Sequence, residues 1–134
     1  MPKPILLVID SADASAHLTG AGEAACAAAC ASAGWQLEHR VVADVAVLEL
    51  ALGVQRAALV INPDGLAADV LRVLRDSLAQ STGPVVEVRL DNIFTNDPVD
   101  GPLQIPGCDL ALVSGMGEAG YALAAQSLTS GATS

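Results

Sequence analysis

Continuous hydrophobic runs alternate with amphipathic stretches along the whole chain. Residues 5–9 form an unbroken aliphatic run, which is typical of a strand buried on both faces. Similar short runs recur between stretches with helical spacing. The strands are expected at residues 5–9, 35–42, 57–61, 84–90 and 110–113. The helices are expected at residues 19–33, 45–52, 66–80 and 117–128. The pattern therefore predicts strands and helices in alternation.

The segment 35–42 differs from the other predicted strands because its residues alternate in character. Trp35, Leu37 and Val41 fall on one face together with His39, and polar or charged residues fall on the other. Such alternation indicates a strand nearer the edge of the sheet. His39 is interpreted here as a strand residue and nothing more.

This alternation predicts an α/β protein, a flavodoxin-like doubly wound five-stranded parallel sheet in a three-layer sandwich. Residues 1–134 are expected to form a single domain whose tail, residues 129–134, is frayed. In such folds the ligand crevice lies outside the carboxyl ends of the strands. Polar residues follow those ends at 10–13, 62–65, 91–92 and 114–115. We therefore expect the working surface along this rim.

The overall charge narrows the choice of partners. Fifteen acidic residues against six basic ones give a net charge of −9, which argues against nucleic acid and anionic membrane. No apolar stretch approaches the ~18 residues of a membrane span, and the run at 5–9 is too short for a signal peptide. The expected partner is a small-molecule substrate, and the expected location is cytoplasmic.

The sequence offers no convincing site for a metal or a cofactor. Cys26 and Cys30 lie four apart on an Ala-rich segment and are expected to be small buried residues in a reduced cytosol. No His, Cys and carboxylate cluster has metal-ligand spacing. Gly115, Gly117 and Gly120 match a dinucleotide fingerprint, but they open the last helix and no strand follows. Neither a metal nor a cofactor is expected.

Several segments, in order along the chain, resemble type II 3-dehydroquinate dehydratase. Residues 5–10 look like that family's first strand, and residues 60–63 resemble its "INPG" turn. Residues 74–78 look like its "LRDAL" helix, and residues 84–93 are similar to its "PVVEVHLSNI" strand and loop. Residues 115–121 resemble its "GLGAQGY". The resemblance implies the same fold and a homo-oligomer built from trimers, possibly a dodecamer.

The family removes water from a cyclic ketone by taking a proton next to the carbonyl. A Tyr on a lid acts as base beside an Arg, Asn residues stabilise the enolate, and a His is the general acid. In this chain the lid region, residues 10–22, contains neither Tyr nor Arg, and Tyr121 belongs to the final helix. The family's catalytic His is missing around residues 62–69. The chain is thus similar to a divergent member that lacks the usual catalytic Tyr, Arg and His.

Other positions that match the family's site keep their residue type or exchange it for another polar one. Asn62 matches an enolate-side Asn, and Glu87 and Asn92 are also retained. Asp13 stands where the family has another Asn, and Arg89 and Asp91 replace a substrate-binding His and Ser.

The candidate residues each carry an alternative interpretation. Asn62 is the strongest catalytic candidate. Asp10 and Asp13 are candidate bases, with turn and helix-capping roles as the alternative. His17 is a candidate base in the space of the lid, with a solvated loop residue as the alternative.

The binding candidates lie at the ends of the third and fourth predicted strands. Arg89 suits a carboxylate or phosphate of a substrate, and the alternative is an ion pair with Asp91, Asp64 or Glu87. Asp64 and Asn92 complete the substrate-binding set, and Asp91 is counted among the catalytic candidates.

Three functions follow as hypotheses. The first is a repurposed lyase, dehydratase or cyclase that acts on a small oxygenated hydroxy-acid or polyketide-like substrate in specialised metabolism. The second is a catalytically silent homologue that serves as an oligomeric scaffold or partner protein. The third is residual 3-dehydroquinate dehydratase activity.

Overall fold

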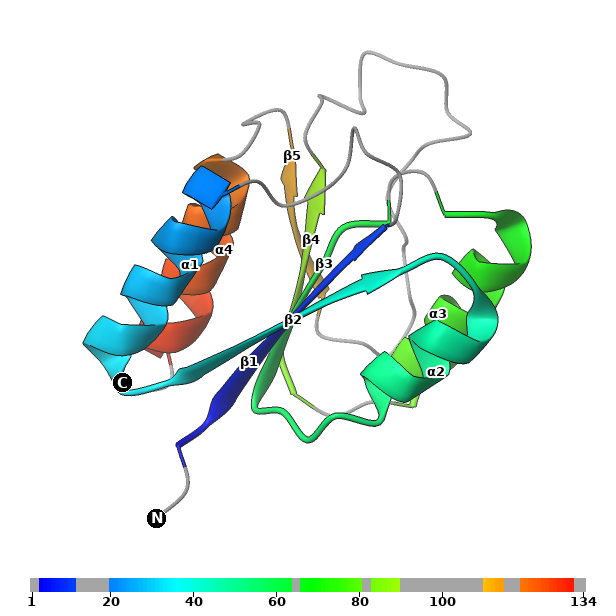
Figure 1. Cartoon of the computed structure of the whole chain (residues 1–134), viewed down its shortest axis with the longest axis horizontal. Coiled ribbons are helices and arrows are strands. Elements are labelled where there is room, and N and C mark those ends of the chain that lie inside the picture. The colour runs from blue at the N-terminus through cyan, green and yellow to red at the C-terminus, as the bar shows by residue number, and fades with distance from the viewer. Residues whose placement is uncertain are drawn as a thin grey trace.

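The described residues of a computed structural model form five strands and four helices in alternation (Figure 1). The structure describes residues 3–11, 20–63, 66–80, 83–89, 110–114 and 119–131. The strands are β1 (Ile5–Ser11), β2 (Gln36–Val42), β3 (Ala58–Ile61), β4 (Val85–Arg89) and β5 (Leu110–Ser114). The helices are α1 (Gly20–Ala33), α2 (Val45–Leu52), α3 (Ala68–Ala79) and α4 (Ala119–Gly131).

The five strands make one parallel sheet in the order β2-β1-β3-β4-β5. Helices α1 and α4 cover one face, and α2 and α3 cover the other (Figure 1). This arrangement confirms the expected flavodoxin-like, doubly wound, three-layer fold. The expectation that the second strand lies at the sheet edge is also confirmed, because β2 pairs only with β1 among the described strands.

The core divides into two clusters because the side chains of each strand alternate between faces. Leu6 and Val8 of β1 belong to the cluster under α1 and α4, which we call the α1–α4 cluster. Leu7 and Ile9 belong to the cluster under α2 and α3, the α2–α3 cluster. All four side chains are fully buried. The continuous aliphatic run of β1 is therefore required, since neither face of this strand meets water.

Two helices end or begin on local signals that the sequence carries. Gly34 follows α1 with a φ of 76°, a conformation that glycine adopts without strain, and Trp35 then donates its backbone N–H to the Cys30 carbonyl at 2.7 Å. Asp44 caps α2 by accepting a hydrogen bond from the backbone N–H of Val47 at 2.9 Å.

Some predicted boundaries were wrong. The strand β1 continues through Asp10 and Ser11, whereas the sequence pattern placed its end at residue 9. The final helix continues to Gly131 instead of ending at residue 128. Thr129, the first residue of the expected frayed tail, is buried in that helix, and its hydroxyl donates to the Ala125 carbonyl at 2.8 Å.

The strand order places a topological switch between β1 and β3. The chain passes from β1 outward to β2 and then crosses to β3 on the other side of β1. Adjacent crossovers in opposite directions open a crevice at the carboxyl ends of these two strands. Asp10 on β1 and Asn62, which directly follows β3, lie at this point.

Leu74→Ala is expected to destabilise the fold by about 2–5 kcal/mol, because Leu74 is fully buried in the α2–α3 cluster and truncation leaves a cavity. Urea unfolding followed by far-UV circular dichroism measures the change. Leu50→Ala is the matched control: that leucine is 76% exposed on α2, so we expect a change within about 0.5 kcal/mol. Equal effects of the two substitutions would contradict the assignment of the core.

Candidate functional site

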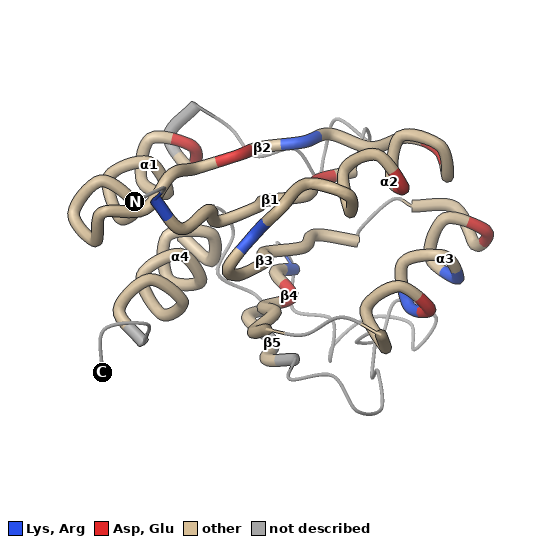
Figure 2. The backbone as a smooth tube through the Cα atoms, turned by 90° about the horizontal axis from the view of Figure 1, so that it is seen from below, with Lys and Arg blue, Asp and Glu red and all other residues tan. Residues whose placement is uncertain are grey.

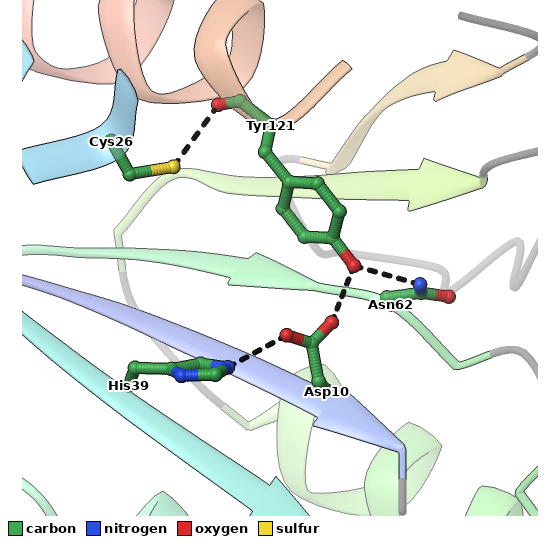
Figure 3. Close-up of polar contacts among 5 residues, drawn as sticks. All are labelled: Asp10, Cys26, His39, Asn62 and Tyr121. Atoms are coloured by element: carbon green, nitrogen blue, oxygen red, sulfur yellow. Dashed lines mark hydrogen bonds and ion pairs between the residues drawn. The ribbon is translucent and has the colours of Figure 1, made fainter. Parts of the chain in front are cut away.

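Four polar side chains from different elements meet at the switch point (Figure 3). They are Asp10 of β1, His39 of β2, Asn62 after β3 and Tyr121 of α4, and we call them the Asp10 cluster. Asp10, Asn62 and Tyr121 are fully buried, and the His39 side chain is 20% exposed. The cluster lies on the α1–α4 side of the sheet because Asp10 continues the alternation of Leu6 and Val8.

Hydrogen bonds connect the cluster into one chain. The Tyr121 hydroxyl donates to Oδ1 of Asp10, and Nδ2 of Asn62 donates to the Tyr121 oxygen at 2.8 Å. On the other side, His39 Nε2 lies 2.7 Å from Asp10 Oδ2. A carboxylate accepts only, and a phenol has one proton, so the proton donated to Asp10 obliges the atom of Asn62 that faces Tyr121 to be the amide nitrogen. The network thus sets the orientation of the Asn62 amide.

The elements hold these groups by backbone contacts as well. The Asn62 backbone N–H donates to the Ile9 carbonyl at 2.9 Å, which extends the pairing of β1 and β3 past the last strand residue. Tyr121 lies on the buried face of α4 with Ala124, Ala125 and Leu128, at helical spacing. Its ring therefore points from α4 towards the carboxyl end of the sheet, as Figure 3 shows.

The thiol of Cys26 adjoins the same cluster from α1. Its Sγ donates to the Tyr121 backbone carbonyl at 3.5 Å. Burial raises the pKa of Cys26 to about 12, and the neighbouring Cys30, Asp10 and Glu23 add to the effect because their negative charge disfavours a thiolate. Burial also raises the pKa of Cys30. Both are free thiols, and the expectation that they are small buried residues is confirmed.

Arg89 and Glu87 form a second polar pair, on the other face of the sheet. Arg89 Nε lies 2.6 Å from Glu87 Oε2, and both side chains are buried. Val86 and Val88 point into the α1–α4 cluster, so the alternation of β4 directs Glu87 and Arg89 to the opposite side. The ion pair is one of the three that the sequence left open. Among the described residues, this pair and the Asp10 cluster therefore lie on opposite faces of the sheet.

The remaining sequence candidates lie outside the described residues. They are Asp13, His17, Asp64, Asp91 and Asn92. Cys108 and residues 115–118 of the glycine motif also lie outside. In the described part of the chain, no three His, Cys, Asp or Glu residues gather in a way that would hold a metal ion. Within the same ranges no helix is long and apolar enough to cross a membrane.

Two interpretations of the sequence were wrong, and one residue was missed. Asp10 was interpreted as a turn or capping residue, but it is a buried residue of β1 that is bonded to Tyr121 and His39. His39 is more than a strand residue, since its ring pairs with Asp10. Tyr121 was treated only as part of the last helix. The helical spacing of Tyr121, Ala124 and Leu128 was the available signal that this tyrosine faces the core.

Chemically, the cluster joins a carboxylate, a phenol and an amide donor in one buried chain. The phenol oxygen of Tyr121 can take up a proton while its own proton moves to the Asp10 carboxylate, so a proton is passed towards Asp10. An amide N–H stabilises negative charge that develops on a carbonyl oxygen. Proton abstraction next to a carbonyl uses groups of these two kinds, a proton acceptor and a donor to the enolate oxygen.

The family model for dehydroquinase class II matches residues 14–129 of this chain. The 3-dehydroquinate dehydratase of Nitrosomonas europaea is 34% identical over 68 residues, which cover 51% of this chain and 46% of that protein. The enzyme of the same name from Nitrosomonas eutropha is 35% identical over 68 residues, with the same shares of each chain. The matched segment therefore spans about half the length of these curated relatives.

Solved structures resemble the whole fold. A type II dehydroquinase from Propionibacterium acnes superimposes with a TM-score of 0.71 and 20% identity, and the match covers 96% of this chain and 99% of that one. A 3-dehydroquinate dehydratase-like protein from Bifidobacterium longum gives a TM-score of 0.61 and 20% identity over 100% of both chains. A type II dehydroquinase from Butyrivibrio crossotus gives 0.69 and 19%, over 94% of this chain and 97% of that one. At these identities the likeness concerns the fold.

Tyr121→Phe is expected to destabilise the protein by about 1–3 kcal/mol, because the buried Asp10 and Asn62 each lose their hydrogen bond to the Tyr121 hydroxyl. Urea unfolding measures the loss. Ser127→Ala, an exposed hydroxyl removed from the same helix, is the control and is expected to change stability by less than about 0.5 kcal/mol. If Tyr121→Phe were as stable as the parent protein, the hydroxyl would not bridge α4 to the sheet.

With Cys30 and Cys108 replaced by Ala, Cys26 is the single remaining thiol. Burial, the largest cause of its raised pKa, remains when Cys30 is replaced and keeps this thiol protonated at pH 8, so at that pH the folded protein should react with an aromatic disulfide reagent at least about 100-fold more slowly than the urea-unfolded chain. Release of the coloured thiol measures both rates. Equal rates would show that the thiol is neither buried nor held neutral.

Proposed function

Because this chain belongs to the dehydroquinase class II family, we propose that it is a lyase that takes a proton next to a carbonyl group of a small oxygenated ring substrate. The curated relatives that share its sequence are 3-dehydroquinate dehydratases. The departures from the family pattern favour a repurposed dehydratase or cyclase in specialised metabolism over an efficient 3-dehydroquinate dehydratase.

The observation that carries this proposal is the position of the Tyr121 hydroxyl. It lies between the carboxylate of Asp10 and the amide nitrogen of Asn62, at the switch point where α/β sheets of this kind bind ligands. Asn62 occupies the position that matches the family's enolate-side Asn. Tyr121 supplies a phenol, which the lid region of this chain lacks.

The proposed reaction needs no electron acceptor. The proton on the carbon next to the carbonyl passes to the Tyr121 oxygen as the phenol proton passes to Asp10. The electron pair left behind forms an enolate, whose oxygen the amide N–H of Asn62 stabilises. The hydroxyl on the adjacent carbon then takes a proton from solvent and leaves as water, so that a carbon–carbon double bond remains, and the proton held by Asp10 returns to solvent. His39 holds the carboxylate that receives the proton.

Other residues are proposed as part of the site because of their positions in the sequence. Asp13, Asp64, Asp91 and Asn92 belong to the same strand ends, and His17 belongs to the region of the family's lid. Arg89 is proposed to bind an acidic group of the substrate, with Glu87 fixing its guanidinium. Assembly into a trimer-based homo-oligomer is proposed from the family resemblance alone.

A second candidate function is a catalytically silent scaffold. The full burial of Asp10, Asn62 and Tyr121 favours it, because a buried and hydrogen-bonded network also serves to tie a helix to a sheet. Arg89 and Glu87 form a buried pair in the same manner. Under this alternative the polar groups stabilise the fold and contact no substrate.

The test is turnover and binding of ring hydroxy-ketoacids, with 3-dehydroquinate as the first compound. Product formation is followed by the ultraviolet absorbance of the conjugated double bond, and binding is followed by titration calorimetry. Asn62→Ala is expected to lower turnover by about 100- to 1,000-fold, because it removes the donor to the enolate oxygen. Gln126→Ala removes an exposed amide from α4 and should leave turnover unchanged.

Folded Asn62→Ala protein with undiminished turnover would place the chemistry elsewhere in the molecule. If the parent protein neither converts nor binds any of the ring acids, the lyase proposal fails and the scaffold function stands.

A further inference from the structure

In the part of the chain that the structure describes, the outer edge of β2 pairs with no other strand, and acidic and basic side chains follow each other along it. Among the described strands, β2 lies at one end of the sheet and bonds only to β1. Val41 on this strand is 41% exposed. Figure 2 shows acidic and basic colour next to each other along β2, at the margin of the molecule. An exposed edge of this kind is a template for pairing with another strand.

The pairing of β2 with β1 fixes which backbone groups face outward. The Gln36 backbone N–H donates to the Pro4 carbonyl at 2.8 Å, so Gln36 and every second residue after it direct their backbone groups towards β1. Leu37, His39 and Val41 therefore direct their N–H and C=O groups to the open edge. An antiparallel partner strand has to bond to these three residues.

When the partner is a second copy of the same strand, only a few registers bring the outward-facing backbone groups of the two copies opposite each other. Centring the two-fold axis on His39 pairs all three outward-facing residues, with Leu37 opposite Val41 of the second copy and His39 opposite its own equivalent. Centring it on Glu38 would place that acid opposite itself, and centring it on Arg40 would do the same for the base. Like charges directly opposite each other destabilise a strand pair.

The register centred on His39 is also the one that the charges favour. In it Glu38 lies opposite Arg40 of the second copy, and Arg40 lies opposite Glu38. These positions are non-hydrogen-bonded pairs, in which side chains approach most closely. Within one chain Glu38 and Arg40 already lie on one face with 3.4 Å between Oε2 and Nη2, and both are partly exposed. Charges on a sheet edge usually prevent pairing, but the order acid, His, base is complementary to itself under a two-fold rotation.

The other face of the strand agrees with this register. Leu37 is partly buried against the α1–α4 cluster, and the exposed Val41 would contact it in the second copy. The outward-facing backbone groups, the order of the charges and the apolar contacts thus all favour the register centred on His39. We propose that two copies of this chain pair antiparallel through β2, about a two-fold axis at His39, and form one continuous sheet across the interface. Such a contact is isologous, because the same surface serves both partners.

The test mixes two charge-reversed variants. Glu38→Arg alone gives a β2 with two positive charges, and Arg40→Glu alone gives one with two negative charges. Each should raise the dissociation constant of the paired form by about tenfold or more, because both cross-strand ion pairs become repulsive. Mixed in equal amounts, the two variants should associate, since every opposing pair is again acid with base. Light scattering with size-exclusion chromatography, at several concentrations, measures the mass.

The mixing step separates the interface from effects within one chain. The contact between Glu38 and Arg40 of the same strand is lost in both variants and is not restored by mixing, so recovery of the mass can come only from pairing between chains. Arg72→Glu, a charge reversal on the exposed side of α3, is the control and should leave the mass unchanged. Far-UV circular dichroism checks that each variant is folded.

A monomeric parent protein would overturn the proposal. So would single variants whose mass equals that of the parent protein at every concentration, or two variants that lose mass and do not regain it when mixed. These outcomes do not depend on whether the lyase reaction is found.

Discussion

Asp10 carries a carboxylate to the carboxyl end of β1, where its side chain is fully buried. An unpaired charge in such a place would cost several kcal/mol, so its partners are a condition of the fold. Tyr121 donates from α4, His39 pairs from the neighbouring strand, and Asn62 joins through the tyrosine oxygen. The buried carboxylate of Asp10 thereby connects β1, β2, the end of β3 and helix α4. The position of α4 over the sheet depends on a hydroxyl as well as on apolar packing.

The sheet divides the polar groups of the rim between its two faces. The Asp10 cluster belongs to the α1–α4 side, and the pair of Arg89 and Glu87 belongs to the α2–α3 side. Strand alternation makes this division unavoidable, because neighbouring residues on a strand point in opposite directions. A ligand that contacts both sets has to reach over the carboxyl ends of the strands. The switch between β1 and β3 is the place where the topology opens such a path.

The fold could be predicted from the sequence because its signals are local. Aliphatic runs of strand length, the Gly34 stop and the Pro63 turn each mark an element without knowledge of its neighbours. The site could be predicted only in part. Asn62 was found because it follows a strand, but the role of His39 depends on a contact with Asp10, 29 positions away in sequence. Such a contact depends on the register between β1 and β2, in which His39 lies opposite Val8, and no local pattern encodes that register.

The small number of aromatic side chains also determines which part of the molecule its intrinsic fluorescence and near-ultraviolet circular dichroism follow. The chain has one tryptophan and one tyrosine, and both side chains lie in the α1–α4 cluster. The α2–α3 cluster is built from aliphatic side chains, so it contributes nothing to the intrinsic fluorescence. Emission and near-ultraviolet dichroism therefore follow the packing of one layer, while backbone signals follow both. A difference between the two kinds of signal during unfolding would separate the loosening of one helical layer from that of the other.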